Sequence, residues 1–267
     1  MVSATLYWDW QVALHDPAAS KYPQKEKIRG NHRDFTIVLL CVIGCAVYVN
    51  DYYHAEETAV QAMAADDHVT VRTAEDGTLL FLPDDPQTGL IFYPGGKVEH
   101  TAYAPLMRAC AERGILCVLL KMPWNLAVLD MNAADGIAEQ FPDIDAWYIG
   151  GHSLGGAMAA NYAAGHSGEF EGLILLAAYS TKDLSGSDLA VLSIYGSEDD
   201  VLNMEKNEAN RDHLPADAIE VVIEGGCHAG FGAYGPQDGD GTPSISGKEQ
   251  IERTAAEIQD LMKEVSQ

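Results

Sequence analysis

The residues best placed to do chemistry lie in the hexapeptide Gly151-His152-Ser153-Leu154-Gly155-Gly156. An apolar run, residues 146–149, precedes it, and an alanine-rich stretch, residues 157–164, follows it. A strand, a tight turn of small residues around one serine, and a helix together form a nucleophile elbow. Glycines allow the close contacts of such a turn, and the N-terminus of the following helix favours negative charge. The pattern therefore predicts Ser153 as a nucleophile.

A serine hydroxyl needs a base to remove its proton and a carboxylate to orient that base. In chains with an elbow, the acid and then the histidine follow the serine, each after a later strand. His228 lies in the glycine-rich turn 225–230, directly after the last predicted strand, and is therefore the predicted base. The turn after the preceding strand offers three acids, namely Glu198, Asp199 and Asp200.

The developing oxyanion of acyl transfer needs two backbone N–H donors. Leu154, the residue after the nucleophile, is the first predicted donor. The second is expected from the loop Tyr93-Pro94-Gly95-Gly96-Lys97, which follows an apolar strand, and Gly96 or Lys97 is the predicted residue. No metal or organic cofactor is needed for this chemistry, and none is predicted.

Strand and helix patterns alternate from about His68, which predicts an α/β fold with a mostly parallel sheet covered by helices on both faces. Asp76-Gly77 between two apolar runs predicts a hairpin at the start. A helix is expected over residues 101–113, and another is expected to end near Gln140. The remaining predicted strands are 69–73, 78–82, 90–93, 115–121, 146–150, 172–177, 190–195 and 219–224, and the remaining helices are 154–165, 204–213 and 247–264.

These motifs resemble the α/β-hydrolase superfamily. The family's G-x-x-D-x-V pattern falls on Gly196, Asp199 and Val201, so the resemblance implies Asp199 as the triad acid, with Asp200 one residue away as the alternative. The layout is closest to small carboxylesterases and dienelactone-hydrolase-like members, although dienelactone hydrolases proper have cysteine where this chain has Ser153.

Two further stretches bear on the mouth of the site. Only about a dozen residues, 178–189, separate two predicted strands where many relatives carry a cap domain, so no lid is expected. Residues 231–241 are glycine-rich and are expected to shape the pocket beside His228. Their Asp238-Gly-Asp240-Gly lacks the other ligands of a calcium loop.

The net charge of −24 argues against nucleic-acid binding, which needs a basic surface to meet phosphates. The predicted partner is a small-molecule ester. Five cysteines fit neither a disulfide framework nor a C-x-x-C metal pattern.

Residues 35–49 form an uncharged apolar run that follows five basic residues and precedes acidic ones. This charge bias predicts a signal-anchor over residues 35–53 with the C-terminal part outside the cytoplasm. The alternatives are a lipoprotein anchored at Cys45, a secretory signal, or a core helix. The resulting segments are a cytoplasmic tail (1–34), the anchor (35–53), a linker or short helix (54–67) and a catalytic domain (68–267).

The sequence thus predicts a membrane-anchored serine hydrolase that cleaves carboxylic esters through an acyl-enzyme. Thioester hydrolysis, acyl transfer and peptidase activity use the same machinery and remain alternatives. A binding protein that kept the fold without activity is the competing class, and the oligomeric state is not predicted.

Overall fold

The computed structural model describes residues 32–266. The chain divides into two compact units, Met1–Ala46 and Val47–Gln267. Of the predicted N-terminal tail, residues 1–31 lie outside the described part. The helix α1 (His32–Asn50) contains the predicted apolar run. Its large apolar side chains are exposed, from 46% for Leu39 to 71% for Phe35. Among the helices of residues 32–266, none combines the length and apolarity needed to cross a membrane.

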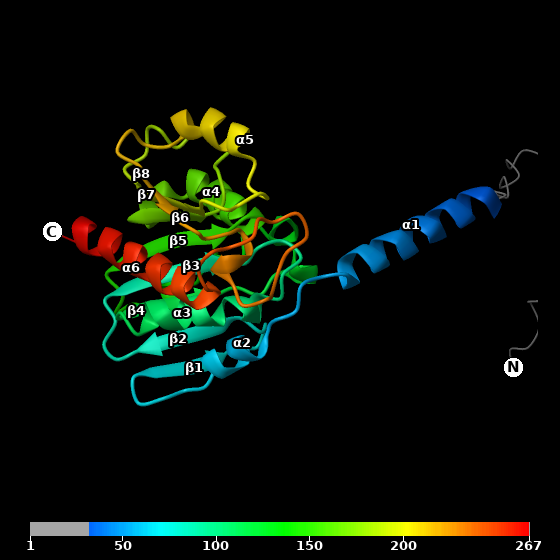
Figure 1. Ribbon diagram of the computed structural model, residues 1–267. Helices are drawn as coiled ribbons and strands as arrows, with labels where there is room; N and C mark the ends of the chain where they lie inside the picture. Colours follow the sequence, from blue (N-terminus) through cyan, green and yellow to red (C-terminus); the bar gives the residue numbers. More distant parts are fainter. Residues whose placement is uncertain (1–31, 267) are drawn as a thin grey trace, which may run out of the picture. The chain divides into compact units, whose positions relative to one another are not determined.

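The second unit is built on one eight-stranded sheet in the order β1-β2-β4-β3-β5-β6-β7-β8. β1 and β2 pair antiparallel, β2 pairs antiparallel with β4, and all other neighbours are parallel, which confirms the predicted mostly parallel sheet. The strands are β1 (Val69–Thr73), β2 (Leu79–Pro83), β3 (Thr88–Tyr93), β4 (Ile115–Leu119), β5 (Ala146–His152), β6 (Gly172–Leu176), β7 (Ala190–Gly196) and β8 (Ile219–Ile223). Figure 1 shows the strands stacked side by side between the helices.

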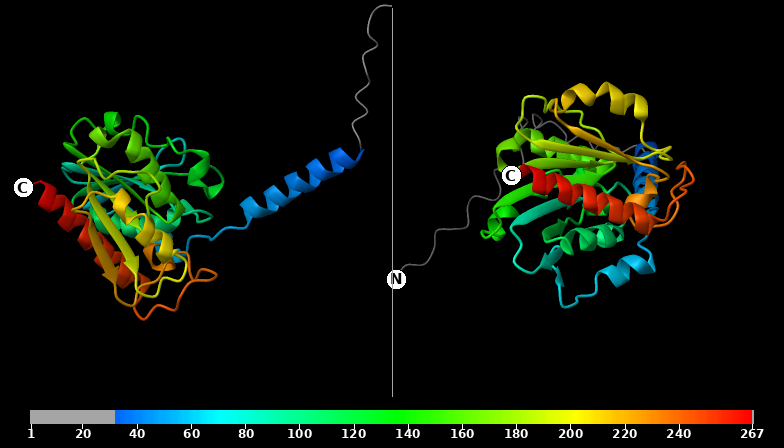
Figure 2. Two further views of the ribbon diagram at one scale, coloured as in Figure 1. Left: turned by 90° about the horizontal axis from the view of Figure 1, so that it is seen from above. Right: turned by 60° about the vertical axis from the view of Figure 1, so that its left-hand side comes forward.

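Helices cover both faces of the sheet because alternate residues of the central strands are buried on opposite sides. Leu90 and Phe92 of β3 belong to a core with α3 (Ala104–Ala111) and α6 (Gly247–Val265). Ile91 and Tyr93 belong to the opposite core, with α4 (Leu154–Gly165). Figure 2 shows α6 crossing one side of the sheet. The short helix α5 (Met204–Ala209) lies between β7 and β8 in the chain.

The predicted helix ending near Gln140 is wrong. Residues 123–140 form three short 3₁₀ turns, Pro123–Asn125, Ala127–Leu129 and Ala138–Gln140, joined by irregular backbone. Trp124 and Asn125 have φ angles of 53° and 54°, which no continuous right-handed helix accommodates.

Residues 51–66, here called the strap, belong to the second unit and contain α2 (Glu57–Ala62). Tyr53 forms a parallel bridge with Val98, in which its N–H donates to Lys97 O at 2.8 Å and its carbonyl accepts from Glu99 N at 2.9 Å. At the far end, Arg108 of α3 donates to Ala62 O at 2.6 Å and to Asp66 Oδ2 at 2.8 Å. The strap is therefore hydrogen-bonded to the rest of the second unit at both ends.

Candidate active site

Ser153 occupies the turn between β5 and α4 with φ 52° and ψ −122°, a strained conformation for a non-glycine residue. The turn is possible because its neighbours lack side chains. A Cβ on Gly151 would lie 2.6 Å from Tyr93 O, and one on Gly155 would overlap Tyr93 O and Pro94 O. Ser153 is half-buried at the carboxyl edge of the sheet, where ligands bind in open α/β folds.

Strained backbone gathers at this edge. Six non-glycine residues among those described have positive φ, and five of them follow the carboxyl ends of parallel strands. These five are Lys97 after β3, Trp124 and Asn125 after β4, Ser153 after β5, and Ala177 after β6. Such conformations persist only where the surrounding structure holds them, and they cluster at functional sites.

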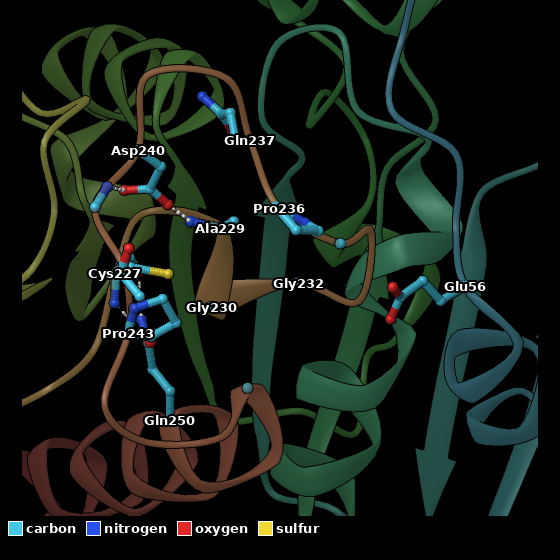
Figure 3. A pocket seen from close by; sticks show the side chains of 14 residues that line it. Glu56, Cys227, Ala229, Gly230, Gly232, Pro236, Gln237, Asp240, Pro243 and Gln250 are labelled. Carbon is cyan, nitrogen blue, oxygen red and sulfur yellow. Dashed lines mark hydrogen bonds between the residues drawn. The ribbon is translucent and has the colours of Figure 1, made fainter.

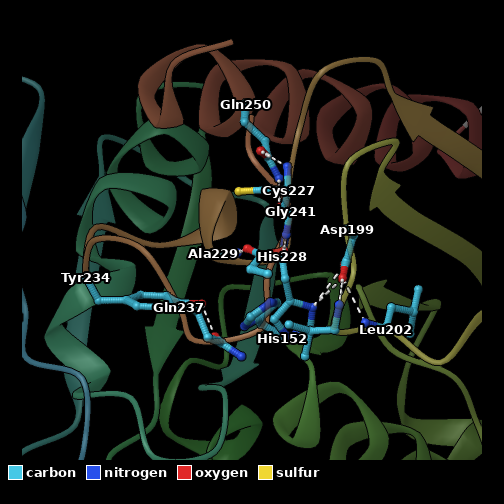
Figure 4. Close-up of polar contacts among 12 residues, drawn as sticks. His152, Asp199, Leu202, Cys227, His228, Ala229, Tyr234, Gln237, Gly241 and Gln250 are labelled. Atoms are coloured by element: carbon cyan, nitrogen blue, oxygen red, sulfur yellow. Dashed lines mark hydrogen bonds and ion pairs between the residues drawn. The ribbon is translucent and has the colours of Figure 1, made fainter. Parts of the chain in front are cut away.

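His228 and Asp199 form a buried pair. His228 Nδ1 lies 2.9 Å from Asp199 Oδ2, and the two side chains are 2% and 1% exposed. Asp199 Oδ1 also accepts hydrogen bonds from the N–H groups of Val201 at 2.9 Å and Leu202 at 2.8 Å (Figure 4). The carboxylate is thus held in place from its own loop while it binds the imidazole.

The two neighbouring acids are placed differently. Glu198 and Asp200 are exposed, whereas Asp199 is buried. Of the three acids that the sequence left open, Asp199 is the one the structure pairs with His228.

Ser153 follows β5 and His228 follows β8, and the residue before Ser153 lies against His228. The ring of His152, the residue before Ser153, lies 4.5 Å from the His228 ring between centroids. No hydrogen bond joins the Ser153 hydroxyl to His228 within residues 32–266. In ligand-free sites such catalytic hydrogen bonds are often long and shorten only with substrate bound.

A series of buried, hydrogen-bonded groups lies beside His228. Gly95 N–H donates to the Tyr103 hydroxyl at 3.1 Å, and that hydroxyl lies 2.8 Å from His152 Nδ1. A hydroxyl can donate one hydrogen bond and accept two, so the tautomer of His152 decides which of the two groups donates. His152 Nε2 is buried and has no hydrogen-bond partner in the described structure.

Burial keeps His152 and Tyr103 uncharged. Desolvation, followed by the nearby His228, lowers the pKa of His152 well below its ordinary value. Desolvation raises the pKa of Tyr103 above its ordinary value. His152 is therefore neutral at pH 7, so it adds no positive charge next to His228.

The loop after β3, which carries two of the predicted oxyanion donors, lies against the elbow. Gly96 lies against Leu154, because a Cβ built on Gly96 would come within 2.8 Å of the Leu154 side chain. The N–H groups of Gly96 and Leu154 have no hydrogen-bond acceptor among residues 32–266. By contrast, Lys97 N–H donates to Asn125 O at 2.8 Å. Of the two donors predicted in this loop, Gly96 is therefore the one whose N–H is not already used within the described part of the chain.

The loop that carries His228 is clamped by two side chains. Asp240 accepts hydrogen bonds from His228 N at 3.1 Å and from Ala229 N at 2.8 Å. Gln250 of α6 accepts from Cys227 N at 3.0 Å and donates to Cys227 O at 2.8 Å. The two side chains therefore fix consecutive peptide groups at the histidine (Figures 3 and 4).

A cavity of about 480 Å³ lies beside this clamp. Figure 3 shows Cys227, Asp240 and Gln250 around it, with Glu56 of the strap across from them. Neither Ser153 nor His228 lines it. Burial and the nearby Asp240 raise the pKa of Cys227 to about 11, so its thiol is protonated and a poor nucleophile at neutral pH.

Three residues that hydrogen-bond around the candidate site were not predicted from sequence. Tyr103 and Gln250 lie in ordinary helical patterns, and only folding brings them to Gly95, His152 and Cys227. Asp240 stood in a noticeable Asp-Gly-Asp-Gly stretch, which indicated a loop at the pocket mouth but not its bonds to the histidine peptide. No group of three histidine, cysteine or acidic side chains suited to a metal occurs among residues 32–266.

The comparisons with known proteins agree with this geometry. The model of the Alpha/beta hydrolase family matches residues 89–252. A comparison with curated protein sequences found no match.

Solved structures of similar fold extend over most of the chain. TT1662 from Thermus thermophilus aligns with a TM-score of 0.54 and 16% identity over 74% of this chain and 98% of its own. Est1E from Butyrivibrio proteoclasticus aligns with a TM-score of 0.51 and 14% identity over 74% of this chain and 100% of its own. A membrane phospholipase A described as a bacterial virulence factor has a TM-score of 0.54 and 14% identity over 88% of this chain and 99% of its own.

At these identities the structural likeness shows the fold, whereas the family model covers more than half of the chain. The sheet order, the strained serine turn and the buried histidine–aspartate pair are all consistent with that match. The chain belongs to the Alpha/beta hydrolase family.

Proposed function

We propose that the protein is a serine hydrolase that cleaves carboxylic esters, with Ser153, His228 and Asp199 as its triad. The observation that carries the proposal is the buried pair of His228 and Asp199 beside the elbow serine. A buried carboxylate on Nδ1 leaves Nε2 of the imidazole as the position that accepts a proton from a nucleophile. An exposed acid would hold the ring less firmly.

In the first half-reaction, Ser153 Oγ attacks the acyl carbon while His228 Nε2 takes the hydroxyl proton. The carbonyl oxygen becomes an oxyanion, which the N–H groups of Leu154 and Gly96 stabilise. The bond to the alcohol oxygen then breaks, and His228 gives its proton to the leaving alcohol. Asp199 keeps the imidazolium oriented and stays ionised throughout.

In the second half-reaction, water attacks the acyl-enzyme and His228 takes one of its protons. The tetrahedral intermediate collapses, the bond between the acyl carbon and Ser153 Oγ breaks, and His228 returns the proton to Oγ. The products are one carboxylic acid and one alcohol. All atoms and protons balance without a cofactor.

Hydrolysis of p-nitrophenyl acetate tests the proposal. Ser153→Ala is expected to lower kcat by about 10⁴ or more, because no nucleophile remains at the elbow. Ser167→Ala, a serine in the turn after α4, is the matched control and is expected to retain wild-type activity. Equal activity of Ser153→Ala and wild type would refute the proposed role of the serine.

We further propose that α1 attaches the enzyme to a membrane, with the hydrolase unit on the extracytoplasmic side. Support comes from the exposed apolar side chains of α1 and from the basic residues before it and acidic residues after it. One structural neighbour is a membrane phospholipase A. The full chain is expected in the membrane fraction after an alkaline wash, and a variant lacking residues 1–46 in the soluble fraction. If Cys45 is a lipid attachment site instead, Cys45→Ser alone releases the protein.

A further inference from the structure

The loop after β4 exposes four large apolar side chains at the carboxyl edge of the sheet. Trp124 is 63% exposed, Val128 49%, Leu129 55% and Met131 39%. They are called the apolar rim here. Outside α1, no other segment of eight residues in the described structure exposes as many large apolar side chains.

The rim is held open by its own backbone. Trp124 and Asn125 are both in the left-handed region, with φ 53° and 54°, although neither is glycine. The Tyr93 hydroxyl donates to Met131 O at 2.9 Å and accepts from Ala134 N at 3.1 Å. Ala127 in the middle of the loop is fully buried. The loop is therefore anchored while its apolar tips remain in solvent.

The rim adjoins the proposed oxyanion donors. Asn125 O accepts the Lys97 N–H at 2.8 Å, and Lys97 directly follows Gly96. On the other side, the turn Ala127–Leu129 packs against α4, the helix that begins right after Ser153. Met131 Sδ lies 3.7 Å from Asn161 Nδ2 of the same helix. Leu154, at the start of α4, is itself only half-buried.

We propose that the apolar rim binds the hydrocarbon acyl chain of the ester, which makes esters of longer fatty acids the preferred substrates. The inference rests on the proposed function. An acyl chain attached to a carbonyl whose oxygen meets Gly96 and Leu154 leaves the site beside these residues. The four side chains of the rim are apolar, with the exposed Asp130 between two of them, and burial of CH₂ groups against the rim favours longer chains.

The preference for longer acyl chains follows from the exposure of the rim side chains to water. With no substrate bound, the tryptophan, valine, leucine and methionine of the rim contact water, so each CH₂ that covers them removes apolar surface on both partners. An acetyl group is too short to extend from Ser153 to the rim, so it gains no binding energy there. The rim therefore affects long-chain esters and leaves acetate hydrolysis unchanged.

The test compares p-nitrophenyl acetate, butyrate and octanoate as dissolved substrates. For the full-length protein, kcat/KM is expected to rise at least about fivefold from acetate to octanoate. The double variant Trp124→Ser/Leu129→Ser is expected to lose this rise while its kcat/KM for acetate stays within about twofold of wild type. The matched control, Ile219→Ser/Val222→Ser, changes two apolar side chains on β8 that are 37% and 40% exposed, and is expected to keep the rise.

Two outcomes overturn the proposal. The first is a wild-type series that is flat on dissolved esters together with no effect of the double variant on vesicles, which shows that the acyl chain does not meet the rim. The second is an equal loss on acetate and octanoate, which shows a general structural effect of the double variant. A second arm uses phosphatidylcholine vesicles, since the same chain can come from a dissolved ester or a lipid surface. If the double variant loses activity only on vesicles, the acyl chain comes from a lipid surface. If it loses activity only on dissolved octanoate, the acyl chain comes from a free ester. Loss of acetate hydrolysis in Ser153→Ala tests the proposed function separately.

Discussion

Asp199 differs from the acids next to it because both of its carboxylate oxygens accept hydrogen bonds. Both oxygens lie within 3.2 Å of His228 Nδ1, and one of them also accepts two backbone hydrogen bonds. Asp200 is exposed and lies one residue away. The two positions therefore provide a matched pair for testing the triad acid.

Asp199→Asn is expected to lower kcat on p-nitrophenyl acetate by about 10³–10⁴, because the amide no longer holds the tautomer that leaves Nε2 free to accept a proton. Asp200→Asn is expected to stay within about twofold of wild type. Steady-state kinetics at pH 8 measures both. The reverse order would assign Asp200 as the acid, and similar small effects would remove both from the mechanism.

His152 makes stability depend on pH. Its pKa is lowered in the folded protein by desolvation and by His228, so the unfolded chain binds its proton first as pH falls. The free energy of unfolding therefore decreases below about pH 6.5, by at most about 1.4 kcal/mol per pH unit from this residue.

His152→Gln supplies a side-chain amide that can hydrogen-bond to the Tyr103 hydroxyl and cannot take up a proton in this range. Urea unfolding at pH 7.5 and 5.5 is expected to show a smaller loss for the variant than for wild type. His100, whose pKa is also lowered, first by burial, contributes the same sign and remains in both proteins. Equal losses would show that His152 is not the group that titrates.

Among the elements, the loop after β8 depends on α6 for its position. Gln250 satisfies both the N–H and the carbonyl of Cys227, the residue before the proposed base. A Cβ on Gly230 would overlap Gln250 Oε1, so the loop is shaped around this side chain. The helix therefore acts on the site through the backbone of the histidine.

Gln250→Leu is expected to lower the free energy of unfolding by about 1–3 kcal/mol, because the buried Cys227 N–H loses its partner and the Cys227 carbonyl keeps only the Gly230 N–H at 3.3 Å. It is also expected to lower kcat about tenfold or more, because His228 is less well positioned. Gln259→Leu on the same helix removes one hydrogen bond to Arg113 O, far along α6 from the histidine loop. This control is expected to lose stability without loss of kcat. Equal kcat in wild type and Gln250→Leu would contradict the positioning role.

Elements with strong local signals were predictable, and contacts between distant segments were not. The elbow, the strands and the order of acid and histidine follow from apolar runs that end in small or charged residues. The loop after β4 was mistaken for a helix because two consecutive left-handed residues, Trp124 and Asn125, carry no glycine to mark them. The clamp by Gln250 joins residues 23 apart, and no local pattern indicates that pairing.

At the scale of the molecule, the second compact unit extends from Val47 to Gln267 and contains the strap. Within the strap, the backbone of Tyr53 is hydrogen-bonded to the residues before and after Val98. The Tyr53 hydroxyl accepts a hydrogen bond from Asp238 N at 3.0 Å. Glu56 N–H donates to Ala233 O at 2.8 Å. The strap thus joins the segment after the oxyanion loop to the loop after His228.

A chain that starts at residue 47 is therefore expected to have nearly the same thermal midpoint and kcat/KM as a chain that starts at residue 32. A chain that starts at residue 67 lacks the strap and is expected to melt about 8 °C lower or more, with reduced kcat/KM. Differential scanning calorimetry and ester hydrolysis measure both effects. Equal melting temperatures for the two shorter chains would show that the strap does not stabilise the unit.

The central claim is that Ser153 is a nucleophile activated by His228 and Asp199, and covalent labelling tests it most directly. The folded protein is treated with a fluorophosphonate and digested, and the modified residue is located by mass spectrometry. The account predicts one adduct, on Ser153, that disappears in Ser153→Ala and forms at least about 10²-fold more slowly in His228→Ala. An unlabelled folded protein, or an adduct on another residue, would contradict it.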